Sequence, residues 1–434
     1  MAEPAIVLLY AAVAFCAIAV YGVTVDNFCT TVFFTIIKNL MKVLVVHNRY
    51  KDRTGEDSVF DREVSLLRSH SNQVDIWTVD NRAIKAGTAL EKISLAKSTI
   101  WSRKANKELS EKLLEAKPDI VHVHNTLPLL SPSIFHACHR ANIPVVHTLH
   151  NYRLICPSNT LFRDGQICEK CVSGTLLNSV RYGCYRSSRT QTAAVAAMLQ
   201  YHRWVNTWSH RIDGYIALSE FQKAKIVASG IAEDKIYIKP NFIESIPQET
   251  TKVEFGSYYL FVGRLIDEKG VRLLIEGYKK ANSKYPLIIM GPGYLQEMVT
   301  QAALEDERIK YVGIQSKEDV LSWMKGAIAL LFPSIWHECS PMTILEAFSC
   351  SLPIISTGYG AIPDIVKHRK TGYMISPATT GELSKAIRWV EKNIQAWVFI
   401  KQNLRDHIDP VYFLDKNCAR LIEIYQRVIY KKTA

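Results

Sequence analysis

The sequence predicts an α/β protein with two domains, each built on a parallel sheet, after a hydrophobic N-terminal helix. A chain of 434 residues with 48% hydrophobic and 22% charged residues is long enough to bury two ordinary cores. From residue 42 onward, short apolar runs alternate with amphipathic stretches, which is typical of repeated βαβ units. The alternation stops in a polar stretch at 243–254 and then restarts, so a linker is expected there.

Residues 1–40 form a separate hydrophobic segment. Ala5 to Val25 carry no charge over a length that can cross a bilayer. Lys38 and Lys42 follow this run, so the positive-inside rule predicts that the remaining chain faces the cytoplasm, anchored at the inner side of the cell membrane. The alternative is that translation starts at Met41, directly before the first expected strand. Both interpretations stay open at this point.

Six strands are expected in the first domain, because short apolar runs rich in β-branched residues are bounded by turn residues. Ligands of parallel sheets bind beyond the carboxyl ends of the strands, so the residues after each run are candidates for function. Gly55 follows the first strand, just ahead of a helix. The three spaced glycines of a dinucleotide fingerprint are absent there, which argues against an NAD enzyme. The expected strands are 43–46, 74–79, 120–124, 145–149, 214–218 and 236–239.

His150 directly follows the fourth expected strand and is therefore placed to face a ligand. An imidazole there can bond a sugar hydroxyl or a backbone carbonyl near a reacting carbon. His147, within the strand, is the weaker candidate. A histidine with only a structural role is the alternative for both.

Four cysteines follow in the segment 156–184, with one Cys-x2-Cys pair among them. Four thiolates at such spacing are typical of a tetrahedral structural zinc site. We therefore predict a zinc ion that staples this insertion and takes no part in chemistry, with reduced thiols packed in a loop as the alternative. The proposed ligands are Cys156, Cys168, Cys171 and Cys184.

The net charge of +12 favours an anionic partner such as phosphorylated substrates or a membrane surface. A helix expected at 190–208 carries Tyr201, Trp204 and Trp208 beside basic residues, which is typical either of contact with a membrane or lipid-linked acceptor or of core packing. The basic residues do not form a run with interleaved aromatics, so a nucleic-acid partner is not expected.

The second domain opens with a strand at 258–262 followed by Gly263-Arg-Leu-Ile-Asp-Glu-Lys-Gly270. Gly263 lets the backbone approach a ligand, and Arg264 and Lys269 bring two cations to the strand end before a helix. Fixed cations there would stabilise a departing phosphate more in the transition state than in the ground state. Isolated surface charges are the alternative interpretation.

Glu338 and Glu346 lie eight positions apart, around an expected strand at 327–332, a loop, and a helix at 341–349 with Ser340 as its N-cap. Glu338 then precedes the helix N-terminus, where unpaired backbone N–H groups attract anions. Two carboxylates beside an anion site suit a ligand with a phosphate and two sets of hydroxyls, such as a nucleotide sugar. Solvated surface carboxylates are the alternative.

The stretch from Glu338 to Glu346 and the segment from Gly263 to Gly270 resemble the motifs of the retaining family 4 glycosyltransferases, and the resemblance extends over about 41–430. It implies two Rossmann-like domains facing across a cleft, the GT-B arrangement, with an acceptor-side domain at 41–243, a donor domain at 255–408, and a C-terminal helix at 409–434 that packs back on the first domain.

The resemblance also implies roles for individual residues. Arg264 and Lys269 would bind the pyrophosphate, Glu346 the ribose, and Glu338 and His150 the transferred sugar, while the glycine turns at Gly55 and Gly263 approach the ligand. The chain departs from the family pattern at Thr54, Asn151, Ser351 and Ala361, where the family often has glycine or aspartate.

Together these features predict a metal-independent, retaining hexosyltransferase that uses a nucleotide-diphosphate sugar, since no Asp-x-Asp pair ends a strand. The expected acceptor is a glycan or lipid-linked molecule in cell-surface polysaccharide synthesis. A nucleotide-sugar epimerase on the same fold and a catalytically inactive nucleotide-sugar-binding scaffold are the alternatives.

Overall fold

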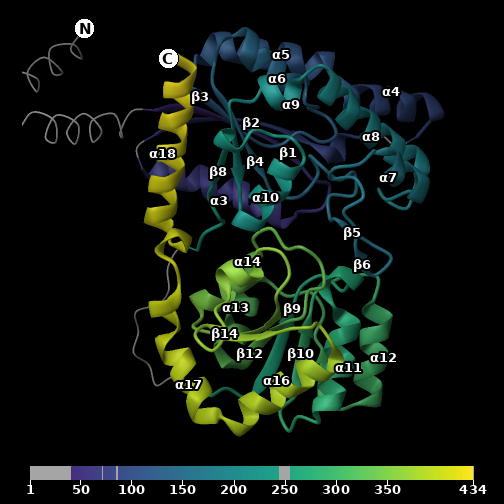
Figure 1. Ribbon diagram of the computed structural model, residues 1–434, viewed down its shortest axis with the longest axis vertical. Helices are drawn as coiled ribbons and strands as arrows, with labels where there is room; N and C mark the ends of the chain where they lie inside the picture. The colour runs from purple at the N-terminus through teal and green to yellow at the C-terminus, as the bar shows by residue number, and fades with distance from the viewer. Residues whose placement is uncertain (1–40, 71, 85–86, 244–254, 434) are drawn as a thin grey trace, which may run out of the picture.

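The computed structural model describes residues 41–70, 72–84, 87–243 and 255–433, which form two lobes, one above the other in Figure 1. The predicted N-terminal hydrophobic helix and nearly all of the predicted linker lie outside these residues. Among the helices in the described ranges, none combines the length and the apolar character needed to span a bilayer.

The first lobe is a six-stranded parallel sheet, which confirms the six predicted strands. The strand order is β2-β1-β3-β4-β7-β8. Strand β3 is buried along its whole length, because it lies in the middle of a sheet covered by helices on both faces. The strands are β1 (Lys42–Arg49), β2 (Gln73–Asp80), β3 (Ile120–Asn125), β4 (Val145–Leu149), β7 (Gly214–Ala217) and β8 (Ile236–Ile238).

The helices of the first lobe connect these strands. The single helix predicted for 190–208 is two helices, because Asn206 adopts a left-handed conformation (φ 53°) that interrupts it. A short hairpin, β5 (Phe162–Arg163) and β6 (Gln166–Ile167), lies within the cysteine segment. The helices are α3 (Gly55–Ser69), α4 (Ala89–Ile100), α5 (Arg103–Ala116), α6 (Ser133–Arg140), α7 (Leu177–Tyr182), α8 (Arg189–Trp204), α9 (Thr207–His210) and α10 (Glu220–Ala228).

The second lobe is also a six-stranded parallel sheet, ordered β11-β10-β9-β12-β13-β14. The direction of strand addition reverses between β9 and β12, and ligands of such sheets bind in the crevice at this switch point. Both second-domain motifs follow these two strands. The strands are β9 (Tyr258–Val262), β10 (Leu287–Met290), β11 (Ile309–Tyr311), β12 (Ala327–Phe332), β13 (Ile354–Thr357) and β14 (Gly372–Ile375).

The helices of the second lobe include α14, whose bounds agree with the helix predicted after Glu338. The predicted N-cap is wrong by one residue: Pro341 is the N-cap, and the Ser340 hydroxyl instead accepts a hydrogen bond from the backbone N–H of Asn241, at 3.2 Å. The helices are α11 (Val271–Ala281), α12 (Gln296–Glu305), α13 (Lys317–Gly326), α14 (Met342–Ser349), α15 (Ile362–Ile365), α16 (Thr380–Lys392) and α17 (Ile394–Asn403).

Helix α18 (Leu414–Thr433) crosses from the second lobe to the first, drawn in yellow along one side of Figure 1. Its buried residues Leu421, Ile424 and Tyr425 belong to the same apolar cluster as Val45 of β1 and Phe60 of α3. Each buried side chain of this size stabilises the contact by about 1.5–3 kcal/mol. The chain therefore ties the two lobes together at a second place besides the linker.

Candidate active site between the two domains

The second-domain part of the site is a close contact between Lys269 and Glu338. Lys269 ends a 3-10 turn after β9, and its Nζ lies 2.6 Å from Oε1 of Glu338, in the loop after β12. The hydroxyl of Ser334 donates to the same oxygen at 2.6 Å. Gly270 makes this approach possible, because its φ is +68° and a Cβ there would overlap the carbonyl oxygen of Pro333. Two motifs far apart in the sequence thus meet at the switch point.

Arg264 and Gly263 occupy the exit of β9 beside this pair. The Arg264 side chain is exposed and forms no ion pair with any described residue, so its charge is open to solvent. A Cβ at Gly263 would meet only the Phe261 ring, at 3.6 Å, and a Cβ at Gly55 would meet nothing within 4 Å. The fold itself therefore does not require glycine at Gly263 or Gly55, and any such requirement would come from a ligand.

Glu346, predicted to hold a ribose, makes a contact that the sequence did not predict. Its Oε1 lies 3.2 Å from a guanidinium nitrogen of Arg62, on α3 of the first domain. Both side chains are partly exposed, with 22% and 16% of their surface accessible to solvent. A ligand hydroxyl at Glu346 would therefore share or replace the partner that Arg62 supplies across the domain boundary.

The first-domain side of the site contains a carboxylate that was not predicted. Glu56, next to Gly55, accepts hydrogen bonds from Nδ2 of Asn151 at 2.6 Å and from the hydroxyl of Tyr50 at 2.9 Å. Burial raises the pKa of Glu56, while these two hydrogen bonds oppose the rise. The sequence did contain a signal for Glu56, because it lies in the segment after the first strand, and ligands of parallel sheets bind beyond the carboxyl ends of the strands.

His150 follows β4 as predicted and lines a pocket with Glu56, Asn151 and Arg153. Its Nε2 lies 2.9 Å from Nδ1 of His124. Burial, followed by the neighbouring His124, lowers the pKa of His150 well below its usual value, so the imidazole is neutral at neutral pH.

His147 has a structural partner within the sheet: its Nδ1 donates to the backbone carbonyl of Val123, at 3.0 Å. Burial lowers the pKa of His147 to about 4. This hydrogen bond gives His147 a structural role within the sheet, which is the alternative stated for it.

The two domains touch next to Glu338. Cys339 is buried within the apolar core of the first domain, where Nε2 of Gln222 lies 3.5 Å from its sulfur. His337 lies 3.2 Å from the carboxylate of Glu169 and packs on the ring of Phe221. The loop that carries Glu338 is therefore held from both sides, which places this carboxylate at the boundary between the domains.

The four cysteines of the 156–184 segment line one small cavity, together with Arg163 and Lys170, and all four are free thiols. Burial raises the pKa of the Cys171 thiol to about 11. Their sulfur atoms are not close enough together to form a metal-binding group: within the described ranges only Glu63, His122 and His124 do so. The convergence of the four thiols agrees with the prediction, but their spacing does not support the predicted zinc ion.

Two family profiles match the chain one after the other. The profile described as Glycosyltransferase Family 4 matches residues 66–245, and the profile described as Glycosyl transferases group 1 matches residues 242–406. Together they cover most of both lobes, including His150, Lys269 and Glu338, whereas β1, the first part of α3 with Glu56, and helix α18 lie outside the matched residues.

Curated relatives are similar over part of the chain. D-rhamnosyltransferase WbpZ of Pseudomonas aeruginosa is 27% identical over 179 residues, which are 40% of this chain and 45% of that protein. Lipopolysaccharide 1,6-galactosyltransferase of Escherichia coli K12 is 28% identical over 211 residues, which are 46% of this chain and 58% of that protein. The chain spans only about half the length of the curated relatives it matches.

Solved structures resemble the chain over nearly its whole length. HepE of Anabaena in complex with UDP has a TM-score of 0.60 at 16% identity, covering 89% of this chain and 100% of HepE. Sucrose-phosphate synthase of Thermosynechococcus elongatus has a TM-score of 0.64 at 13% identity, covering 90% of this chain and 100% of that one. At such identities the likeness concerns the fold alone. With both family profiles matched in tandem and two lobes that are each built on a parallel sheet, the chain belongs to the family 4 glycosyltransferases of GT-B fold.

Proposed function

We propose that this protein is a retaining glycosyltransferase that moves a hexose from a nucleotide-diphosphate sugar to a glycan or lipid-linked acceptor in cell-surface polysaccharide synthesis. The observation that carries the proposal is the Lys269–Glu338 pair, which lies at the switch point of the donor domain and next to the contact with the first domain. Relatives named as lipopolysaccharide galactosyltransferases and O-antigen mannosyltransferase, and a structural neighbour solved with UDP-glucose, support it.

In this proposal the chain's own cations take up the charge of the leaving group, without a catalytic metal ion. Lys269 and Arg264 contact the diphosphate, whose negative charge grows as the glycosidic bond breaks. Glu338 pairs with Lys269, so an incoming diphosphate would compete with this carboxylate for the ammonium group. Glu338, with Ser334 still bonded to it, is then available for sugar hydroxyls, and Glu346 for the ribose.

The acceptor side would lie against a membrane, at the cytoplasmic face of the cell membrane. Helix α8 packs against α4 and α7, and these helices expose apolar side chains, with Leu90 79% and Trp204 76% accessible. Exposed lysines and arginines on the same helices, among them Lys92 and Arg181, suit an anionic lipid surface. Loss of cosedimentation with anionic vesicles in a Leu90→Ser/Trp204→Ser variant would support this surface; unchanged cosedimentation would contradict it.

The cysteine segment would have a structural role if its four thiols closed around a zinc ion. The cavity that they already share is the support for this idea, and zinc would have to stabilise the thiolates that burial disfavours at Cys171. Metal analysis of the protein purified under reducing, chelator-free conditions should find one zinc per chain. A metal-free chain of unchanged stability would refute the idea.

A donor panel followed by a transfer assay tests the proposed function. UDP-, GDP- and ADP-sugars are screened for thermal stabilisation of the protein, since a ligand of the folded state raises its melting temperature. The stabilising donor is then incubated with and without glycan acceptors, in the presence of EDTA, and the anomeric configuration of the product is read by NMR. Acceptor-dependent transfer with retained configuration is expected. Donor conversion without acceptor would indicate an epimerase, and binding without turnover a scaffold.

A further inference from the structure

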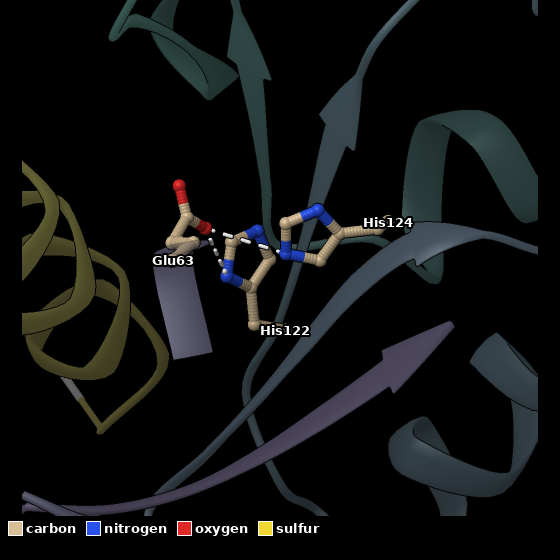
Figure 2. A group of neighbouring side chains, drawn as sticks. All are labelled: Glu63, His122 and His124. Atoms are coloured by element: carbon tan, nitrogen blue, oxygen red, sulfur yellow. Dashed lines mark ion pairs between the residues drawn. The ribbon is translucent and has the colours of Figure 1, made fainter. Parts of the chain in front are cut away.

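A buried polar cluster lies directly behind His150 in the first domain. Figure 2 shows the side chains of His122 and His124, both on β3, directed toward the carboxylate of Glu63 on α3. Oε1 of Glu63 lies 3.3 Å from Nδ1 of His122 and 3.3 Å from Nε2 of His124. Each of the three residues is no more than 2% exposed. A carboxylate so deeply buried needs an opposite charge nearby.

Lys239 supplies that charge. Its Nζ lies 2.5 Å from Oε2 of Glu63, and the lysine is itself 2% exposed. Burial alone would raise the pKa of Glu63, but Lys239 and the two imidazoles lower it well below its usual value. Glu63 is therefore an ionised group that can only accept hydrogen bonds.

The cluster reaches His150 through His124, whose Nδ1 lies 2.9 Å from Nε2 of His150. Within the described part of the chain, Oε1 of Glu63 and Nε2 of His124 have no hydrogen-bond partner of their own, although they lie 3.3 Å apart. Two buried polar atoms without other partners at this distance are expected to pair with each other.

This order of contacts decides where the protons are. A neutral imidazole has one N–H donor and one acceptor nitrogen. Because Glu63 can only accept, Nε2 of His124 carries the proton, and Nδ1 of His124 is an acceptor. Nε2 of His150 must then be the donor in the bond between the two histidines. The opposite arrangement would place the lone pair of His124 Nε2 against a buried carboxylate, which is unfavourable.

We propose that Lys239, Glu63 and His124 form a buried relay that fixes the tautomer of His150, with the proton on Nε2 and an unprotonated Nδ1 left for the ligand. Nδ1 of His150 forms no hydrogen bond with any described residue, and His150 lines the pocket with Glu56 and Asn151. His150 thus presents a hydrogen-bond acceptor, suited to a substrate hydroxyl that donates. This last step rests on the proposed function, whereas the tautomer does not.

A bound metal ion is the competing interpretation, since the ligand atoms of Glu63, His122 and His124 lie within 4.8 Å of one another. Two features oppose it. Lys239 already neutralises Glu63, and a cation beside its ammonium would be repelled. Both nitrogens of His122 are also occupied, by the hydroxyl of Tyr425 at 2.6 Å and that of Thr148 at 2.7 Å.

Side-chain 15N NMR of the histidine-labelled full chain tests the relay without any substrate. The His150 signals are identified by their loss in His150→Gln. In the wild-type protein they should show a protonated Nε2 and an unprotonated Nδ1. A proton on Nδ1 would overturn the proposal. Stoichiometric Zn2+ that shifts the His122 and His124 signals would overturn it as well.

Substitutions of His124 separate the relay from simple packing. His124→Phe removes the acceptor, so the two His150 tautomers should interconvert and give averaged signals. His124→Asn should keep the wild-type pattern, because the amide oxygen of asparagine can take the position of Nδ1 and accept from Nε2 of His150. The control His202→Phe alters another buried histidine, bonded to Thr207 and the Ile100 carbonyl, and should leave His150 unchanged.

A variant that removes both charges keeps the test informative if His124→Phe does not fold. Glu63→Gln/Lys239→Met leaves no unpaired buried charge. The amide of the new glutamine can either donate to or accept from His124, so neither tautomer of His150 is favoured and averaged signals are expected. An unaltered tautomer in both His124→Phe and this double variant would refute the relay.

Kinetics with the donor found in the panel then tests the consequence for the ligand. His124→Phe should lower kcat/KM roughly 10- to 100-fold, the range seen when a residue that orients a metal-ligating histidine is replaced, while His124→Asn stays near wild type. Equal losses in both variants would contradict an orienting role. The predicted tautomer in a chain that transfers no sugar would support the relay and overturn the proposed function.

Discussion

Replacing Lys269 by alanine should separate the catalytic role of this cation from its structural one. The change leaves the Glu338 carboxylate, 5% exposed, with only the Ser334 hydroxyl as partner. Removing one member of a buried ion pair costs about 3–5 kcal/mol, and the lower end applies because Lys269 is 16% exposed and Ser334 remains. Turnover should fall roughly 100- to 1,000-fold, as when one preorganised group that stabilises developing charge is removed.

The assay combines thermal unfolding with initial rates of sugar transfer. Lys269→Ala/Glu338→Gln removes both charges, so it should recover much of the lost stability but none of the turnover. Lys279→Ala is the matched control, because this lysine forms an exposed ion pair of similar length, 2.8 Å, with Glu305 in the same domain; its loss should change stability by less than about 1 kcal/mol. Turnover of Lys269→Ala within twofold of wild type would show that Lys269 does not stabilise the leaving group.

Three further predictions concern other contacts. Arg62→Ala should release Glu346 and lower the KM for the donor by roughly two- to fivefold, since partly exposed ion pairs contribute up to about 1 kcal/mol. Arg68→Ala on the same helix is the control. An increased KM in Arg62→Ala would count against competition between Arg62 and the donor for Glu346. Burial lowers the pKa of His122 from 6.5 to about 4 and that of His124 from 6.5 to about 3. Below pH 6.5 the unfolded chain therefore binds more protons than the folded protein does. Melting temperatures should therefore be highest above pH 6.5 and fall from there toward pH 4, and a flat profile would contradict neutral buried histidines. Burial raises the pKa of Asp57, but hydrogen bonds from His47 and Thr54 outweigh this effect and lower the pKa from 3.8 to about 2. Asp57→Asn should therefore lower the free energy of unfolding by roughly 2 kcal/mol at neutral pH. That contribution is present above pH 3.8 and lost as pH falls through about 2, and equal melting temperatures of variant and wild type at neutral pH would exclude it.

Much of the fold could be predicted from the sequence because parallel strands buried on both faces are short apolar runs. Strand β14 was missed, since Gly372 to Ile375 contains Gly and Tyr and has no long apolar run. The end of α8 was also missed, because the left-handed conformation of Asn206 depends on tertiary packing and cannot be predicted from the spacing of apolar residues.

The candidate site was predictable where a motif follows a strand, as for Lys269, Glu338 and His150. Their partners were not. Arg62 and Glu346 are 284 positions apart in the sequence, so only the packing of the two domains brings them together. The sequence contained only a weak signal for the relay behind His150. His122 and His124 are at alternate positions of a buried strand, so their side chains face the same side of the sheet and require a buried polar partner.

The affinity for a nucleoside diphosphate is the decisive measurement, because Arg264 and Lys269 are proposed to bind the diphosphate. Titration calorimetry would compare the preferred nucleoside diphosphate with its monophosphate in the wild-type protein and in Arg264→Met/Lys269→Met. The wild-type protein should bind the diphosphate much more tightly than the monophosphate. The variant should lose this preference while binding the monophosphate nearly as tightly as the wild-type protein does. An undiminished preference for the diphosphate in the variant would show that Arg264 and Lys269 do not bind it.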